Sequence, residues 1–315
     1  MNSNHGKMAA IDVHKKVLYI VSADLETGSF KRGRFGATTV ELRRLTSWLM
    51  TEQVQTVVME STAQYWRPVW IALEGSFRLL LAQARSNPAP RGRKSDYADA
   101  TRLLKRLCSD DLRLSFVPDA EQRDWRLLTR TRVEYGREII RLRHRLESLL
   151  EECQIKLSSL LSDLLGVTGR RILRALVEGQ MNPQQLAQLR VGPVRASEDE
   201  LAEALNGVLR SPCRLLLAQH LDQVEALERQ IEEIDQELSY LLQLHQAAIL
   251  RLCEVPGVAT SAAEQIIAEV GPTAATFPTP AQLASWIGVC PGRQESAGVS
   301  QSDASPKGIV SCAVS

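Results

Sequence analysis

The hydrophobic pattern of this chain changes its period near Pro118, and that change constrains the fold more than any other feature. Before it, short apolar runs alternate with helical segments, which predicts the order β-β-β-α-β-α-β and a mixed α/β sheet. After it, apolar residues follow helical spacing for about forty residues and in most of the remaining chain. We therefore predict an α/β domain followed by α-helical parts.

The front part predicts a hairpin over Ala9 to Leu25 that turns at His14 to Lys16. It also predicts strands at Phe30 to Gly36, Val54 to Met59 and Phe77 to Ala82, and helices at Thr39 to Met50, Arg67 to Glu74 and Ser95 to Cys108. Further along, apolar positions alternate spacings of three and four from Val224 to Leu241, which predicts a helical arm or coiled-coil segment from Leu216 to His245. These patterns give three expected domains, 1–117, 118–248 and 249–315, of which the middle one could include helices that complete the first.

Composition excludes several classes of protein. Hydrophobic residues make up 44% of the chain and charged residues 24%, which is ordinary for a globular protein and excludes disorder, collagen and small disulfide scaffolds. The chain has no long apolar run and no apolar signal region at its start, so we expect a cytoplasmic protein without a membrane span. Its six cysteines are scattered without a C-x-x-C pair, which argues against structural zinc.

The charge is distributed unevenly. Residues Met1 to Arg145 hold 26 basic and 16 acidic residues, a net charge of +10, and the remainder holds 12 and 21, a net charge of −9. Eight of the arginines lie between Arg123 and Arg145. A basic front half suits a polyanion such as nucleic acid, and an acidic rear half suits a protein surface or the basic half of a second copy.

Four acidic residues form a candidate metal site. Asp12 interrupts an apolar strand and Glu60 ends another, where a charge is costly unless it is paired or binds a metal. Asp96 and Asp99 are three residues apart on a predicted helix and would project from one face. Such carboxylates could hold two Mg²⁺ ions for phosphodiester chemistry. The alternative is a surface acid at a strand end and ordinary acids at a helix start.

Several blocks of the sequence resemble one family. The segments IDVHKK, VVMESTAQYWRPVW and GRKSDYADATRLLKRL resemble the three acidic blocks of the DEDD transposases of bacterial insertion sequences, the insertion-sequence one-ten family that includes the Piv/MooV DNA invertases. The resemblance continues through FVPDAEQRDWRLLTRTR and KLSSLLSDLLGVTGRRILRAL into the last sixty residues. It places the catalytic, metal-binding tetrad on Asp12, Glu60, Asp96 and Asp99.

The resemblance implies an α/β plus α architecture. Its parts would be an RNase H-like (RuvC-like) mixed-sheet domain, a helical coiled-coil middle and a small, mostly helical C-terminal domain. It implies a DNA transposase or site-specific recombinase that uses Mg²⁺ or Mn²⁺. The implied partners are DNA, a structured noncoding bridge RNA encoded by the element, and further copies of the chain in a dimer or tetramer. Such a bacterial protein would associate with the nucleoid when it acts.

The rear segment contains two further candidate sites. The turn around Pro256-Gly257 resembles a helix-hairpin-helix turn, in which backbone N–H groups at a helix start bind a phosphate, although a simple interhelical turn fits the pattern as well. The Glu-Ser-Ala-Gly loop resembles the family's serine loop, which makes Ser296 the candidate nucleophile. Past Lys307-Gly308 the sequence departs from the family pattern, so we expect a truncated or altered C-terminus.

Basic residues flank the acidic site in the sequence. Arg91, Arg93 and Lys94 directly precede Asp96, and Arg123, Arg126 and Arg130 open the arginine-rich helix. We expect these six, with Gly257, to contact nucleic acid, the alternative being a solvated ionic helix. His14 is expected to be a turn residue rather than a ligand, with a supporting role beside Asp12 left open.

Two other functions remain open from the sequence. An RNase H-type, structure-selective nuclease would need the four acids but not Ser296. An inactive nucleic-acid-binding remnant of a decayed insertion element would fit the unusual C-terminus. A recombinase that uses Ser296 would leave protein joined to DNA, whereas a nuclease would release free ends.

Overall fold

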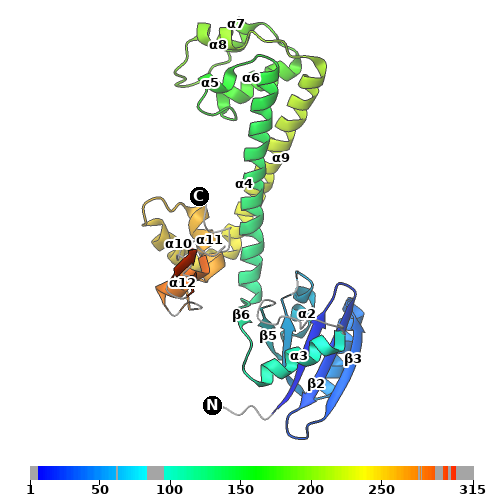
Figure 1. Ribbon diagram of the computed structural model, residues 1–315. Helices are drawn as coiled ribbons and strands as arrows, with labels where there is room; N and C mark the ends of the chain where they lie inside the picture. Colours follow the sequence, from blue (N-terminus) through cyan, green and yellow to red (C-terminus); the bar gives the residue numbers. More distant parts are fainter. Residues whose placement is uncertain are drawn as a thin grey trace. The chain divides into compact units, whose positions relative to one another are not determined.

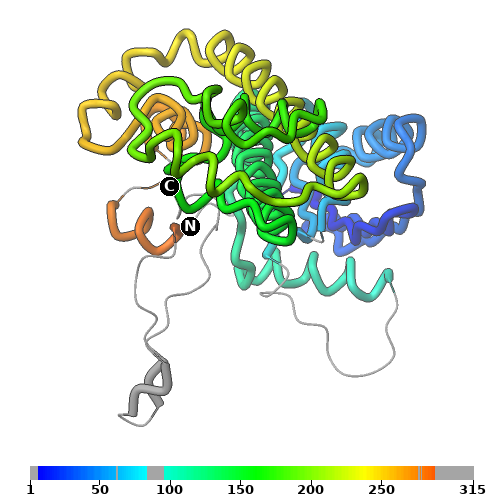
Figure 2. The backbone as a smooth tube through the Cα atoms, turned by 90° about the horizontal axis from the view of Figure 1, so that it is seen from above, coloured from blue at the N-terminus to red at the C-terminus, as the bar shows by residue number. Residues whose placement is uncertain are grey.

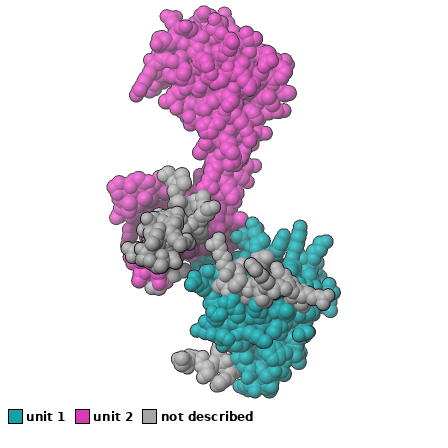
Figure 3. All heavy atoms as spheres, viewed as in Figure 1, with its two compact units in different colours: residues 1–118 teal, residues 119–315 magenta. Residues whose placement is uncertain are grey.

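The computed structural model describes residues 6–61, 63–83, 96–275, 277 and 279–287, and the backbone of 294–296 and 299–302. Two compact units divide the chain, Met1–Pro118 and Asp119–Ser315 (Figure 3). The expected first boundary, at residue 117, lies beside this division, while residues 249–270 are part of the second unit. Within the described residues, no helix is both long and apolar enough to cross a membrane.

The first unit is built on a six-stranded mixed sheet. Its strands are β1 (Lys7–Val13), β2 (Val17–Asp24), β3 (Phe30–Gly36), β4 (Val54–Glu60), β5 (Arg78–Ala82) and β6 (Leu114–Ser115), in the order β3-β2-β1-β4-β5-β6 (Figure 1). The central strands β1, β4 and β5 run parallel, and the outer pairs are antiparallel. The predicted hairpin and the three further strands are therefore confirmed, and only the two-residue β6 was not expected.

Helices cover both faces of this sheet. On one face, α1 (Thr39–Thr51) and α2 (Trp66–Leu73) pack against Ile11 and Val57, and on the other, α3 (Asp96–Cys108) packs against Ala10 and Val58. Successive side chains of a strand point to opposite faces, so each central strand supplies both cores. Burial on both faces explains why β1 and β4 appear in the sequence as continuous apolar runs.

The second unit is organised by two long antiparallel helices, α4 (Ala120–Glu152) and α9 (Ser211–Leu241), which lie side by side (Figures 1 and 2). Pro118 precedes α4, and the Asp119 carboxylate caps it by accepting a hydrogen bond from the Gln122 backbone N–H. The change of period in the sequence thus marks a helix start. The expected arm from Leu216 to His245 corresponds to most of α9 and the turn that follows it.

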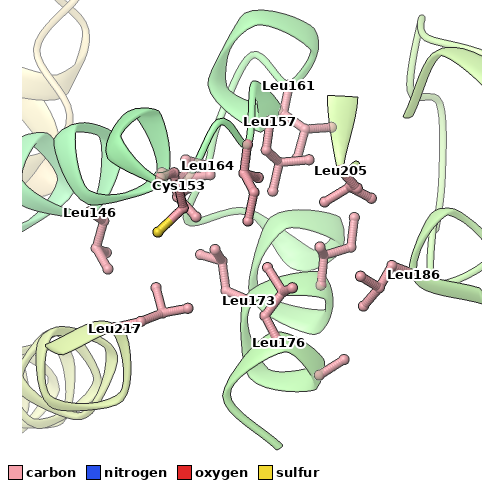
Figure 4. Packing of buried hydrophobic residues seen from close by; sticks show 14 of the residues in the cluster. Leu146, Cys153, Leu157, Leu161, Leu164, Leu173, Leu176, Leu186, Leu205 and Leu217 are labelled. Atoms are coloured by element: carbon pink, nitrogen blue, oxygen red, sulfur yellow. The ribbon is translucent and has the colours of Figure 1, made fainter. Parts of the chain in front are cut away.

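Short helices cover one end of this pair. They are α5 (Leu157–Leu160), α6 (Val167–Glu178), α7 (Pro183–Ala187) and α8 (Glu198–Ala204). Their leucines pack with Leu146 of α4 and Leu217 of α9 in the largest apolar cluster among the described residues (Figure 4). This cluster holds the ends of the two long helices together.

Near the other end of α4, two further helices of the same unit pack against it. These are α10 (Gln246–Cys253), which follows the short 3-10 helix η2 (Gln243–His245), and α11 (Thr260–Val270). Trp125 of α4 packs there with Ile249 of α10 and Ile267 of α11. Beyond them lie α12 (Pro280–Ile287) and the hairpin of β7 (Gln294–Ser296) and β8 (Val299–Ser302).

Candidate functional site

The two strand acids occupy neighbouring positions on one face of the sheet. Strands β1 and β4 are adjacent and parallel, with Ile11 paired to Met59, so Asp12 and Glu60 each follow by one residue. Both also lie two residues beyond side chains that pack under α3, Ala10 and Val58. Side-chain alternation therefore places both acids on the face that α3 covers.

The two helix acids belong to the stripe of α3 that faces the sheet. Ala100, Leu103 and Leu104 are buried against the strands, and Asp96 and Asp99 continue that stripe by one turn toward the start of the helix. The carboxylates of β1 and α3 meet at the end of β1, where His14 Nε2 lies 3.1 Å from Asp12 Oδ2 and 3.7 Å from Asp96 Oδ1. Residues that are more than eighty positions apart in the chain thus share one site.

The electrostatic environment of Asp12 disfavours its negative charge. Burial of the carboxyl raises its pKa, the neighbouring His14 acts in the opposite direction, and the negative charges of Asp99 and Asp96 raise it further. Only 19% of this side chain is exposed. A bound cation would offset both the burial and the repulsion between carboxylates.

The sequence did not predict which way the His14 side chain points. His14 lies in the β1–β2 turn, as expected, and its backbone N–H donates to the Val17 carbonyl at 3.1 Å. Its ring, however, turns back toward the acids, and one ligand atom each of Asp12, His14 and Asp96 lie within 4.8 Å of one another. Within the described part of the chain, this is the group of three that has the spacing of a metal site.

The other two acids stand beside this group rather than in it. Asp99 Oδ1 accepts a hydrogen bond from Arg102 Nη1 at 2.6 Å, yet its charge still raises the pKa of Asp12. Glu60 is the last residue of β4, is half-buried, and pairs in register with Ala82 of β5. The structure thus brings Asp12 and Asp96 together directly and Asp99 near enough to affect Asp12, and it places Glu60 at the matching position of the neighbouring strand.

Arg91, Arg93 and Lys94 lie outside the described residues. Ser296 is the last residue of β7 and pairs with Val299 of β8. The structure describes the backbone of Ser296 and not its side chain.

The arginines that open α4 have structural partners. Arg130 forms a two-pronged ion pair with the fully buried Glu269 of α11, at 2.7 and 2.8 Å, and Arg126 Nε donates to the Ala268 carbonyl at 2.9 Å. Arg123 is half-buried on the same helix. The sequence predicted these three as nucleic-acid contacts, whereas the structure engages Arg126 and Arg130 inside the second unit.

Gly257 lies in the turn between α10 and α11. Its φ of +87° is a conformation that favours glycine, and a side chain added there would meet nothing within 4 Å. A turn between two helices is therefore present, with Pro256 and Gly257 in it, and it fits both the helix-hairpin-helix turn and the simple interhelical turn.

A basic surface that the sequence analysis missed lies beside the acidic site. Arg32 and Arg34 lie two residues apart on β3. Their guanidinium carbons lie over the rings of Tyr97 and Tyr19, 5.4 and 5.8 Å from the ring centroids. The two tyrosine rings meet edge to face with centroids 5.1 Å apart, and the centroids of the Tyr19 and His14 rings are 6.0 Å apart. We call Tyr19, Arg32, Arg34 and Tyr97 the arginine–tyrosine strip. Arginines at alternate positions of a predicted strand were its signal in the sequence.

Two cavities differ in what lines them. An open pocket of ≈ 470 Å³ adjoins the acidic site and is lined by Lys15, Lys16, Tyr19 and Tyr65 together with His14 and Asp96. A larger one, ≈ 830 Å³, lies among α5, α6 and α8 of the second unit and contains no predicted site residue. Of the two, only the smaller pocket adjoins the acidic site, because His14 and Asp96 line it.

A mixed six-stranded sheet with acids at the ends of adjacent strands is compatible with an RNase H-like fold, and so with enzymes that act on nucleic acid. Residues 9–155 match the family model of the IS110 DEDD domain, described as Transposase, and residues 250–309 match the model described as Transposase IS116/IS110/IS902 family. The chain belongs to the IS110-type transposases. A search of curated proteins finds no match to it.

Proposed function

We propose that this transposase cuts and rejoins DNA strands at the site formed by Asp12, Glu60, Asp96 and Asp99. The observation that carries the proposal is the convergence of Asp12 and Asp96 at the end of β1, with both strand acids on the face covered by α3. Carboxylate oxygens are the ligands that Mg²⁺ and Mn²⁺ prefer. These four side chains would hold the divalent ions that DEDD transposases use.

We propose a role for each acid from its position. Asp12 lies at the centre, mostly buried and close to His14 and Asp96, so it would bind the ion most directly. Glu60 and Asp99 would approach the same ions from the neighbouring strand and the next helical turn. The bound ion would lower the barrier by stabilising charge on the attacking and leaving oxygens of the phosphodiester.

Ser296 is our proposed nucleophile, on the strength of the family resemblance and its position at a hairpin. Its hydroxyl oxygen would form a bond to phosphorus as the bond from phosphorus to one deoxyribose oxygen breaks. That oxygen would leave as a hydroxyl with the serine's proton. The resulting phosphoserine ester keeps the energy of the broken bond, and attack by another strand's hydroxyl would restore the DNA and the serine.

Ser296→Ala is expected to eliminate a covalent protein–DNA adduct. Labelled DNA would be incubated with protein, Mg²⁺ and the RNA transcribed beside the gene, and then run on a denaturing gel. The control is Ser300→Ala, since Ser300 lies on the paired strand β8. An adduct that persists in Ser296→Ala at the level of the control would contradict the assignment.

The same gel tests the second candidate function, a structure-selective nuclease of the RNase H type. The first unit supports this alternative, because it contains the four acids without Ser296. Free DNA ends without any adduct, unchanged in Ser296→Ala, would favour the nuclease. DNA binding without cleavage or adduct would favour an inactive remnant of an insertion element.

The arginine–tyrosine strip is our proposed path for a DNA strand into the site. Arg32 and Arg34 are exposed and lie on the same side of β3, and both are joined through Tyr97 and Tyr19 to the surroundings of His14. Guanidinium groups bind phosphates, and tyrosine rings can stack on bases. Arg91, Arg93 and Lys94, next to Asp96 in the sequence, would extend the basic surface.

Arg32→Gln/Arg34→Gln is expected to weaken DNA binding and reduce its salt dependence. Each phosphate contact contributes about 0.9 to the slope of log affinity against log salt on duplex DNA, so losing two should lower the slope by about 2. Fluorescence anisotropy over a salt series measures this. Arg43→Gln is the control, because Arg43 is exposed on α1, on the opposite face of the sheet. An unchanged slope in the double variant would remove the strip from the DNA path.

We propose two further partners on the basis of the family alone. A structured bridge RNA would choose the target and donor by base pairing, which leaves the protein mainly backbone and shape contacts to make. Two or four copies of the chain would act together, so that several strands can be cut in one complex.

The Gly257 turn would add a contact to a DNA phosphate through backbone N–H groups of α11.

A further inference from the structure

We propose that His14 is itself a ligand of the divalent ion, with imidazole Nε2 completing a ligand set with Asp12 and Asp96. The proposal rests on the proposed function, since it adds a nitrogen to the metal site made by the four acids. It differs from the expectation that only carboxylates bind the ions. It also gives a role to a side chain that the sequence indicated as part of a turn.

The spacing of the three ligand atoms carries this inference. Around an octahedral Mg²⁺ with ligand bonds of about 2.1 Å, neighbouring ligand atoms lie about 3 Å apart and opposite ones about 4.2 Å apart. His14 Nε2 is 3.1 Å from Asp12 Oδ2 and 3.7 Å from Asp96 Oδ1, and one ligand atom from each of the three residues lies within 4.8 Å of the others. One ion could therefore contact all three with only small movements of the side chains.

The local fold holds the imidazole in this place. The turn that carries His14 is closed by the hydrogen bond from its backbone N–H to Val17, and its ring meets the edge of Tyr19 at 6.0 Å. Tyr19 is in turn packed against Tyr97 of α3, the helix that carries Asp96. The ring and one of its carboxylate partners are thus positioned by the same small aromatic cluster.

A nitrogen ligand has a chemical consequence that a purely carboxylate site lacks. Imidazole favours transition metals, whereas Mg²⁺ is bound mainly by oxygen. The protein should therefore bind Mn²⁺ more tightly than Mg²⁺ by a margin that depends on His14. Removal of His14 should weaken Mn²⁺ binding by about tenfold or more and weaken Mg²⁺ binding less.

The direct test is pulsed electron paramagnetic resonance of the full chain loaded with Mn²⁺, without DNA. A ¹⁴N coupling from a coordinated imidazole is expected in the natural protein and should be lost in His14→Ala and His14→Gln. His144→Ala is the matched control, because His144 is an exposed histidine on α4 beside Glu147 and could bind Mn²⁺ adventitiously. Circular dichroism would verify folding, which should hold because 48% of the His14 side chain is exposed.

The possible outcomes distinguish a failure of this inference from a failure of the proposed metal-dependent function. Coupling that survives in His144→Ala but disappears in both His14 variants supports a nitrogen ligand. A second outcome is that Mn²⁺ binds to the natural protein and not to Asp12→Asn, but shows no ¹⁴N coupling that depends on His14. That result overturns the inference and leaves the acidic site intact. If the natural protein binds no Mn²⁺ at this site, the inference and the proposed metal site fail together.

Discussion

Asp12→Asn is expected to abolish DNA cleavage, with a fall in rate of at least about 10³-fold. The substitution keeps the shape of the side chain and removes the charge at the centre of the site, where His14 and Asp96 lie nearby. Metal ions supply several kcal/mol of charge stabilisation in phosphodiester chemistry, and each 1.4 kcal/mol is a factor of ten in rate. Single-turnover cleavage followed on denaturing gels measures the loss.

The variant should remain folded and should still bind DNA. Burial and like charges raise the pKa of Asp12, so a neutral amide relieves an unfavourable charge in the metal-free protein. Asp24→Asn is the control, since Asp24 ends the strand paired with β1 and accepts backbone hydrogen bonds from Glu26 and Thr27. Asn can accept the same bonds, so this variant should cleave normally. Undiminished cleavage by Asp12→Asn would reject the acidic site.

The sequence predicted the sheet and its acids because these depend on local patterns. Apolar runs ending at Glu60 or interrupted by Asp12 indicated buried strands, and Asp96 and Asp99 lie at helical spacing. The face on which the strand acids lie follows from the same alternation once β1 and β4 are known to be parallel neighbours. The pairing of β1 with β4 is a long-range contact, which the hydrophobic pattern of each strand does not predict.

The sequence could not predict where individual polar side chains turn. His14 was correctly expected in a turn, but the direction of its ring depends on Tyr19 and on the arrival of α3 above the strand ends. Likewise, Arg126 and Arg130 were expected to contact nucleic acid because the helix contains more arginines than Glu134, Glu138 and Glu147 can pair with. Their partner, Glu269, lies about 140 residues away in the chain.

The ion pair between Arg130 and Glu269 connects the two segments of the chain that match the transposase family models. Helix α4 lies in the first matched segment and α11 in the second, and both belong to one compact unit. Besides the pair with Arg130, Arg132 Nη1 donates to Asp235 and to the buried Glu264 at 2.6 and 2.7 Å. These ionic contacts specify how α11 docks, because each buried acid has a defined arginine on α4.

Glu269→Ala is expected to destabilise the second unit by about 3–5 kcal/mol, the usual cost of removing one partner from a buried ion pair. The Glu269 side chain is 0% exposed, and its loss would leave Arg126, which is 15% exposed, without its buried counter-charge. Thermal and urea unfolding measure the change, and hydrogen exchange should locate it in α11. Glu232→Ala, at an exposed position of α9, is the control and should shift stability by less than about 0.5 kcal/mol.

A triple variant separates the cost of an unpaired charge from the cost of lost packing. Arg126→Met/Arg130→Met/Glu269→Leu removes the charges together, and replacement of a whole buried ion cluster by apolar residues is often close to neutral. We therefore expect it to recover most of the stability that Glu269→Ala loses. If the triple variant is as unstable as the single one, α11 is held by the carbonyl contacts of Arg126 and the apolar cluster around Trp125 rather than by ion pairing. If Glu269→Ala is as stable as the control, the arginines that open α4 are available to nucleic acid after all.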